Sequence, residues 1–276
     1  MTTFRFYCRP HGVRDFRRNP QTPRRAQFNP DGAAALRCAI PVSMGEEDVK
    51  TIMAVGAHHD DNELVAGTLA LHKQAGWRVV SVVMTNGVWI KGACSAEHIP
   101  IREAESRAAA GMLGMETEFL RFPEGAFRSN LESSLALLRV VRQYAPDIVI
   151  AHDPHDYHLD HMETAKCAYE VGFMTWNPGL LAEVPPCHSH RLYYADTWFV
   201  PFQPDEYVDI TATLDLKLAM MRCHRSQLPD EPTEGDMMDL TERQSRTRGI
   251  ESGVRFAEAF RFVPRLASVR LSELLR

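Results

Sequence analysis

A run of apolar residues that ends in a burst of histidines and carboxylates constrains the fold of this chain more than any other stretch. Residues 52–57 match a short buried strand, and a helical pattern starts at about Glu63. Between them stand four polar side chains, those of His58, His59, Asp60 and Asp61. Clustered carboxylates repel one another and lose hydration near a core, and a divalent cation relieves both penalties. The stretch therefore predicts a strand that delivers part of a metal or acid–base site at its carboxyl end.

Strand-like and helix-like segments alternate from Val49 onward. Strands are expected at 49–57, 78–85, 118–122 and 147–151, and helices at 63–75, 101–113 and 130–144. Apolar strands that alternate with helices imply right-handed crossovers and a mostly parallel sheet. We therefore expect an α/β, Rossmann-like fold with helices on both faces of the sheet and functional side chains beyond the carboxyl ends of its strands. No glycine-rich phosphate motif follows any of these strands, so nucleotide binding has no support in the sequence.

The C-terminal part is less regular. We expect strands at 192–194 and 198–200, a helix over 214–223, an acidic loop at 231–239 and a long helix over 241–262. The loops at 88–99, 174–190 and 228–240 are expected to form the walls of a pocket.

Residues 1–45 differ from the rest because arginines and prolines cluster there and hydrophobic periodicity is poor. This composition predicts a basic, flexible N-terminal extension ahead of a catalytic domain over residues 46–276. Met44 stands just before the first strand, so one interpretation places the natural start there. A functional basic arm is the alternative.

Composition excludes some classes of partner. The formal net charge of −5 gives no global basic field, so we expect no nucleic-acid partner. No apolar run is long enough to span a membrane, and the N-terminus lacks the apolar region of a secretory signal. The six cysteines are scattered and form no CxxC pair, which favours reduced thiols and a cytoplasmic protein. The oligomeric state stays open.

A second polar burst follows the strand expected to end at Ala151. Residues 152–161 hold histidines at 152, 155, 158 and 161, interleaved with aspartates. Because the carboxyl ends of parallel strands meet at one edge of a sheet, the two bursts can share one site. Two histidines and a carboxylate with an open position for water are typical of a catalytic hydrolytic metal site. The same donors could hold Fe²⁺ in an oxygenase, which the α/β pattern disfavours. Spacing alone does not select the ligands.

Both bursts match motifs of a known family. Residues 57–70 resemble the AHPDDxEL…GGTLA signature of the PIG-L/LmbE family of zinc-dependent N-deacetylases, and His158-Leu159-Asp160-His161 resembles its HPDH motif. Weaker similarity lies at 102–105, 122–125 and 217–227. The resemblance implies a hydrolase that removes acetyl from an N-acetylglucosamine-type sugar or glycoconjugate. A hydrolase of a non-sugar amide or ester, and a non-catalytic metal- or carbohydrate-binding protein, stay as alternatives.

The resemblance also implies a role for each matching residue. The zinc ligands would be His58, Asp61 and His161, with Fe²⁺ or another divalent ion as the alternative metal. Asp60 would take a proton from the metal-bound water. His158, protonated, would steady the oxyanion or donate to the leaving amine, and Asp160 would orient His158 and raise its pKa.

Further candidates and two departures complete the expectations. Substrate-binding candidates are Arg102, Glu124, Tyr157 and His224, although Arg102 could instead belong to an exposed, salt-bridged helix face. His152 and His155 are expected to be structural or rim groups rather than ligands. His59 replaces the usual proline, and we favour a place behind the ligands or at the surface for it over a ligand or substrate contact. The family's glycine pair is shortened to Val65-Ala66-Gly67, which should matter only for packing.

Overall fold

The computed structural model describes residues 49–264. The predicted extension over 1–45 and the alternative start at Met44 lie outside the described residues.

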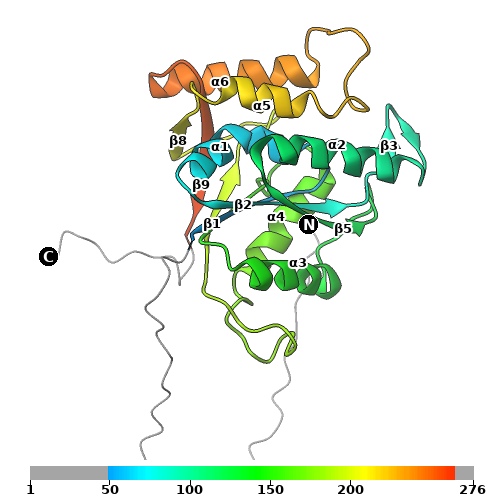
Figure 1. Ribbon diagram of the computed structural model, residues 1–276, viewed down its shortest axis with the longest axis vertical. Helices are drawn as coiled ribbons and strands as arrows, with labels where there is room; N and C mark the ends of the chain where they lie inside the picture. Colours follow the sequence, from blue (N-terminus) through cyan, green and yellow to red (C-terminus); the bar gives the residue numbers. More distant parts are fainter. Residues whose placement is uncertain (1–48, 265–276) are drawn as a thin grey trace, which may run out of the picture. The chain divides into compact units, whose positions relative to one another are not determined.

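A seven-stranded sheet forms the centre of the described unit (Figure 1). Its strands stand in the order β5-β2-β1-β6-β7-β9-β8. Their bounds are β1 Thr51–Gly56, β2 Arg78–Thr85, β5 Glu116–Phe122, β6 Ile148–Ala151, β7 Arg191–Ala195, β8 Glu206–Asp209 and β9 Ala257–Val263. The first five strands of this order, β5, β2, β1, β6 and β7, are parallel. Strand β9 runs antiparallel to both β7 and β8. The expected mostly parallel α/β sheet is confirmed.

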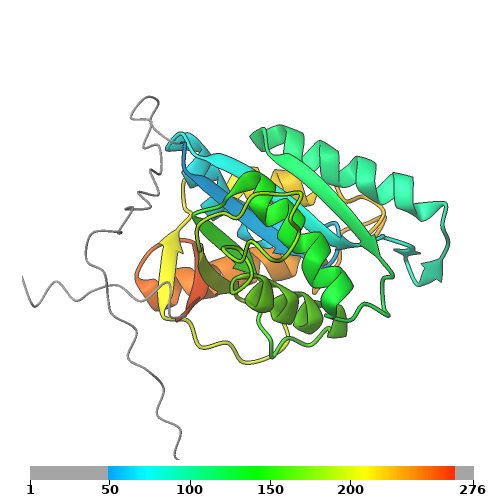
Figure 2. The same ribbon diagram turned by 90° about the horizontal axis from the view of Figure 1, so that it is seen from below.

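Helices cover both faces of the sheet. They are α1 Ala66–Gln74, α2 His98–Leu113, α3 Leu131–Tyr144, α4 Leu159–Val171, α5 Leu214–Met221 and α6 Met237–Ser252, and a short 3₁₀ helix, η2 Asn62–Val65, precedes α1. Figure 1 shows α1, α2, α5 and α6 on one side and α3 and α4 on the other, and Figure 2 shows the green helices α3 and α4 on the near side. Alternate residues of β1 serve the two cores: Met53 packs with α3 and α4, and Ile52 with α1, α2 and α5.

The order of the strands creates one switch point. The chain moves from β1 outward through β2 to β5, then returns to place β6 on the other side of β1. The parallel register pairs Val55 with Ala151, so β1 and β6 end side by side. Ligand sites of open α/β sheets lie at such a point, beyond the carboxyl ends of the strands. The two polar bursts therefore leave the sheet together.

Two C-terminal predictions are wrong. Residues 198–200 form bends rather than a strand, and the helix expected over 241–262 is α6 followed by β9. Gly253 ends α6 in the left-handed conformation, with φ 77°. Residues 257–263, whose apolar spacing is typical of a helix, form strand β9 because they pair with β7 and β8. Helix α6 also starts within the expected acidic loop, where Asp236 caps Met238 and Asp239.

Two further features bear on the site. A small antiparallel hairpin that the sequence did not predict, β3 Trp89–Ile90 with β4 Ala93–Cys94, follows β2. Helix α4 begins at Leu159, so His161 lies in its first turn. Within residues 49–264, no helix has the length and apolar character that crossing a membrane requires.

Candidate active site

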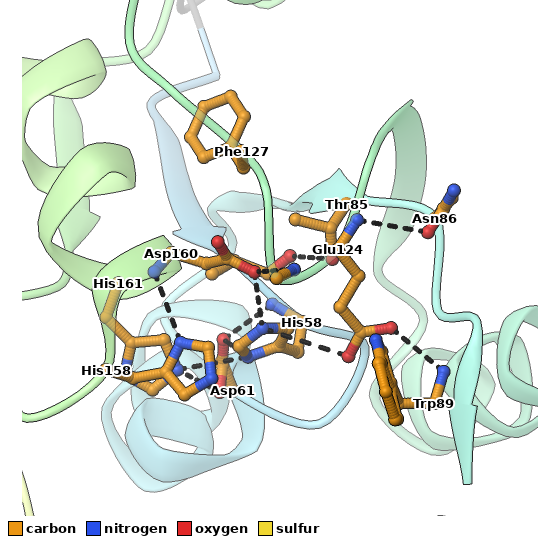
Figure 3. Close-up of polar contacts among 12 residues, drawn as sticks. His58, Asp61, Thr85, Asn86, Trp89, Glu124, Phe127, His158, Asp160 and His161 are labelled. Atoms are coloured by element: carbon orange, nitrogen blue, oxygen red, sulfur yellow. Dashed lines mark hydrogen bonds and ion pairs between the residues drawn. The ribbon is translucent and has the colours of Figure 1, made fainter. Parts of the chain in front are cut away.

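Three polar side chains converge beyond the ends of β1 and β6 (Figure 3). The Nδ1 atom of His58 lies 3.1 Å from Nε2 of His161, and the Asp61 carboxylate lies 3.4 Å from each of these nitrogens. Donor atoms at ligand distances of about 2.0–2.2 Å from a tetrahedral zinc ion stand about 3.3 Å apart. The three residues that the resemblance assigns to the metal therefore fit a divalent ion in number, type and spacing.

The electrostatics of this cluster also favour a cation. Burial lowers the pKa of His58, but the carboxylates of Asp61 and Asp160 outweigh it and raise that pKa to about 10. Burial likewise lowers the pKa of His161, and Asp61 together with Asp156 raises it to about 9. The carboxylates thus stabilise a positive charge between His58, Asp61 and His161, and a bound metal ion would supply this charge.

Two neighbouring histidines contribute in different ways. His152 Nε2 accepts a hydrogen bond from the main-chain N–H of Ala57, 3.0 Å away, and lies 3.0 Å from Asp61. The His152 ring therefore stabilises the end of β1, and the lone pair of Nε2 is used in this hydrogen bond. The spacing of His152 from Asp61 and His161 also suits a metal ion. The side chain of His155 is 81% exposed and pairs with Asp153. These positions agree with the structural and rim roles expected for the two rings.

Asp60 is held by a buried guanidinium. Arg102 Nη2 lies 3.0 Å from Asp60, and Arg102 Nη1 lies 2.9 Å from Glu124. Burial raises the pKa of Asp60, but Arg102 together with His224 and His58 outweighs burial and lowers the pKa below its ordinary value, so the carboxylate is ionised. Arg102 is 2% exposed, which excludes an exposed helix face.

The predicted partnership of His158 and Asp160 needs correction. The Asp160 carboxylate accepts from Gly125 N at 2.6 Å and lies 3.3 Å from His58 Nε2. It is the main-chain N–H of Asp160 that donates to His158 Nδ1, at 3.2 Å. Burial and the neighbouring imidazoles of His58 and His161 lower the pKa of His158, and Asp160 offsets this only in part. His158 is therefore a neutral ring whose proton stands on Nε2.

A pocket of about 200 Å³ opens over this cluster. Beyond the residues already placed near the metal, its walls carry Arg102, Glu124, Tyr157, Trp198, Gln227 and Met237. A larger surface groove of about 780 Å³ between α5 and α6 is lined by much of the loop 228–240, but it contains none of the catalytic, metal-binding or substrate-binding residues proposed from the sequence. Of the three loops expected as walls, 228–240 supplies Met237 to the pocket, and 88–99 supplies no lining residue. The loop 174–190 does not line the pocket either. It wraps instead around the buried guanidinium of Arg142, which donates to the carbonyls of Met174, Thr175, Asn177, Leu180, Leu181 and Val184.

His224 does not lie at the substrate rim. Its ring is fully buried, with Nε2 3.3 Å from Glu63. Three residues later, Gln227 reaches the pocket, and the intervening Ser226 is fixed by two hydrogen bonds to Glu105, at 2.8 and 2.6 Å. Within the motif 224–227, the residue that lines the pocket is therefore the last and not the first.

His59 is buried away from the metal cluster. Its ring is 1% exposed and stacks on Phe119 with a centroid distance of 5.3 Å. A side chain on Gly87 would collide with the ring, since a Cβ there would lie 2.5 Å from Cε1. Burial and the nearby Arg102 lower the pKa of His59 to about 3, so the ring is neutral. Of the roles considered for His59, a packed position behind Asp60 fits, and a surface position does not.

The cluster fits a metal ion, has an ionised carboxylate beside it and opens into a pocket. This arrangement is typical of enzymes that activate water. Residues 53–171 match the family model described as PIG-L: GlcNAc-PI de-N-acetylase. This match spans both polar bursts, and the resemblance to the PIG-L/LmbE family found in their motifs is confirmed.

Two deacetylases and a hydratase are among the known proteins to which this chain is similar. The diacetylchitobiose deacetylase of Thermococcus kodakarensis is 29% identical over 234 residues, covering 79% of this chain and 84% of the relative. The structure of N,N'-diacetylchitobiose deacetylase from Pyrococcus horikoshii superposes with a TM-score of 0.71 and 28% identity, covering 79% of this chain and 85% of the other. The 4-oxalmesaconate hydratase of Pseudomonas putida is 26% identical over 209 residues, covering 69% and 80% of the two chains.

Proposed function

We propose that this protein is a metal-dependent N-deacetylase that removes acetyl from an N-acetylglucosamine-type sugar or glycoconjugate and releases acetate and a free amine. The observation that carries the proposal is the convergence of His58, Asp61 and His161 beside the ionised carboxylate of Asp60. The named deacetylases among its relatives support the same chemistry.

His58, Asp61 and His161 would hold the metal, with zinc as the ion best suited to their nitrogen and oxygen donors. With zinc bound, these residues would place a Lewis acid at the pocket, which would supply a water molecule of near-neutral pKa and polarisation of the acetyl carbonyl. Asp61 is occupied by this task, since its two oxygens already face His58, His152 and His161.

Asp60 is free for proton transfer. Its carboxylate is ionised and one oxygen is fixed by Arg102 at 3.0 Å, so the group can accept a proton without moving. The proton on Asp60 is then available to the departing amine, which leaves only when protonated. His158 presents Nε2–H at the pocket and can donate to the oxyanion of the tetrahedral intermediate.

The pocket suits one sugar ring. Its volume of about 200 Å³ is small, and its walls combine charged and amide groups with aromatic rings. Arg102 and Glu124 offer donors and acceptors for hydroxyl groups, and Tyr157, 42% exposed, can cover a ring face.

The test is acetate release from a panel of N-acetyl sugars by the chelator-treated protein and by the same protein reloaded with Zn²⁺. The proposal predicts release only after reloading. Full activity of the metal-free protein would overturn the metal scheme, and failure of every sugar would overturn the substrate class.

A second candidate, hydration of an unsaturated acid at the same metal, is favoured by the similarity to 4-oxalmesaconate hydratase. The same activated water would then add to a carbon–carbon double bond. Supplying 4-oxalmesaconate to the zinc-loaded protein and following its absorbance separates the two reactions, because a deacetylase leaves this acid unchanged.

A further inference from the structure

The β3–β4 hairpin is fastened to the wall of the pocket through the main chain of Trp89. The N–H of Trp89 donates to Glu124 Oε2 at 3.2 Å. Its carbonyl accepts from Arg102 Nη1 at 3.3 Å and from Gln227 Nε2 at 3.2 Å. All three partners line the pocket, so the position of Trp89 is fixed relative to the metal cluster.

The indole of Trp89 lies only one glycine away from the residues around the metal. A Cβ on Gly125 would stand 3.7 Å from the indole Nε1. The N–H of Gly125 donates to Asp160, whose carboxylate lies 3.3 Å from His58. Figure 3 shows Trp89 beside Glu124, at the edge of this network. Gly125 has φ 77° and no side chain, which leaves the space beside the indole open.

The main chain of Trp89 is anchored, and its indole is left uncovered. The residue is 42% exposed, and within residues 49–264 no aromatic ring or cation stacks on it. The exposed rings of Tyr157 and Phe199 differ, since they pack on each other at 4.8 Å. A large apolar ring, on a main chain anchored by three residues of a polar pocket, is suited to stack on a ring of the ligand that extends out of that pocket.

We propose that Trp89 is a specificity-determining residue, whose indole stacks on the sugar ring next to the acetylated one. The inference rests on the proposed function. The pocket of about 200 Å³ encloses one ring, so a second ring must lie outside it, where the indole stands. The substrate class is then a disaccharide or longer glycan rather than a monosaccharide.

The test compares kcat/KM for N,N'-diacetylchitobiose with kcat/KM for N-acetylglucosamine in each variant of the zinc-loaded protein. Trp89→Ala is expected to lower the ratio of the two values about 3- to 10-fold. Trp89→Phe should restore most of the ratio because it keeps a stacking ring. Trp176→Ala is the matched control, since Trp176 is 63% exposed and lies in the loop 174–190, which wraps around Arg142 and not around the pocket. An unchanged ratio in Trp89→Ala would overturn the inference.

Binding separates this inference from the proposed function. If the wild-type protein released no acetate from either sugar, the proposed function would fail. Titration calorimetry of N,N'-diacetylchitobiose would then decide the inference by itself: weaker binding by Trp89→Ala than by Trp176→Ala upholds it, and equal binding overturns it.

Discussion

At the scale of single residues, the adjacent carboxylates of Asp60 and Asp61 show how the site divides its labour. Asp61 faces three imidazoles, whereas Asp60 faces the guanidinium of Arg102. The sequence alone could not separate them, because both follow the same strand. Arg102 comes from α2, and its contact with Asp60 joins residues that are 42 positions apart.

Replacing Arg102 with methionine should destabilise the protein strongly. The substitution leaves Asp60 and Glu124 buried without their cation, and removal of one partner from a buried ion pair costs about 3–5 kcal/mol. Urea denaturation measures the change. Arg107→Met on the same helix is the control, because its side chain is 55% exposed and an exposed pair contributes about 1 kcal/mol or less. Similar losses in the two variants would contradict the role given to Arg102.

His224 should make stability depend on pH. Burial lowers its pKa, but Glu63 outweighs burial and raises it above the ordinary 6.5. The paired, protonated ring therefore stabilises the fold fully below pH 6.5, and this contribution is lost as the pH rises through the higher folded-state pKa. The difference in unfolding free energy between wild type and His224→Gln is expected to shrink as the pH rises from 6.5. Glu63→Gln should show the same trend, and a difference that grows with pH would refute the pairing.

At the scale of elements, the start of α1 depends on β9 and α5. The carboxylate of Glu258 accepts from the N–H groups of Gly67 and Thr68, each at 2.9 Å, where the helix dipole favours a negative charge. Lys217 neutralises this carboxylate at 2.8 Å and donates to the carbonyl of Leu64. The lysine of the weak motif at 217–227 thus anchors a helix and does not line the pocket.

Gly67, near the start of α1, has no room for a side chain. A Cβ there would lie 2.7 Å from Ile210 and 2.9 Å from Glu258. Gly67→Ala should lower the free energy of unfolding by about 1–3 kcal/mol, through overpacking. Gly111→Ala is the matched control in a helix, because a Cβ at Gly111 meets nothing within 4 Å and should stabilise the fold by about 0.4–1 kcal/mol. Thermal unfolding of both variants measures the contrast, and a neutral Gly67→Ala would contradict the packing.

Elements whose signal is local were predictable. The strand at 78–85 has the predicted bounds, and α3 ends at Tyr144 as predicted and begins with a capping box formed by Asn130 and Ser133. The failures lie where a distant partner decides. Residues 257–263 form a strand because β7 and β8 pair with them, and the spacing of Phe256, Ala259 and Phe260 carries no sign of those partners.

At the scale of the whole molecule, topology explains why the site could be assembled from two separate bursts. Parallel strands end at the same edge of a sheet. Two predicted strands, each followed by a motif, are therefore enough to predict that His58 and His161 lie together. The pocket walls were less predictable. Gln227 lines the pocket and donates to the carbonyl of Trp89 across 138 residues of sequence, and no periodicity encodes such a contact.

The central claim is that Asp60 moves the proton at a metal held by its neighbours, and Asp60→Asn tests it most directly. The measurement pairs zinc content with the rate of acetate release from N,N'-diacetylchitobiose. We expect Asp60→Asn to bind zinc as the wild type does and to lose about 10²- to 10⁴-fold in kcat, since the amide cannot accept the proton. Asp61→Asn should instead lose the zinc. A zinc-loaded Asp60→Asn protein with undiminished turnover would contradict the account.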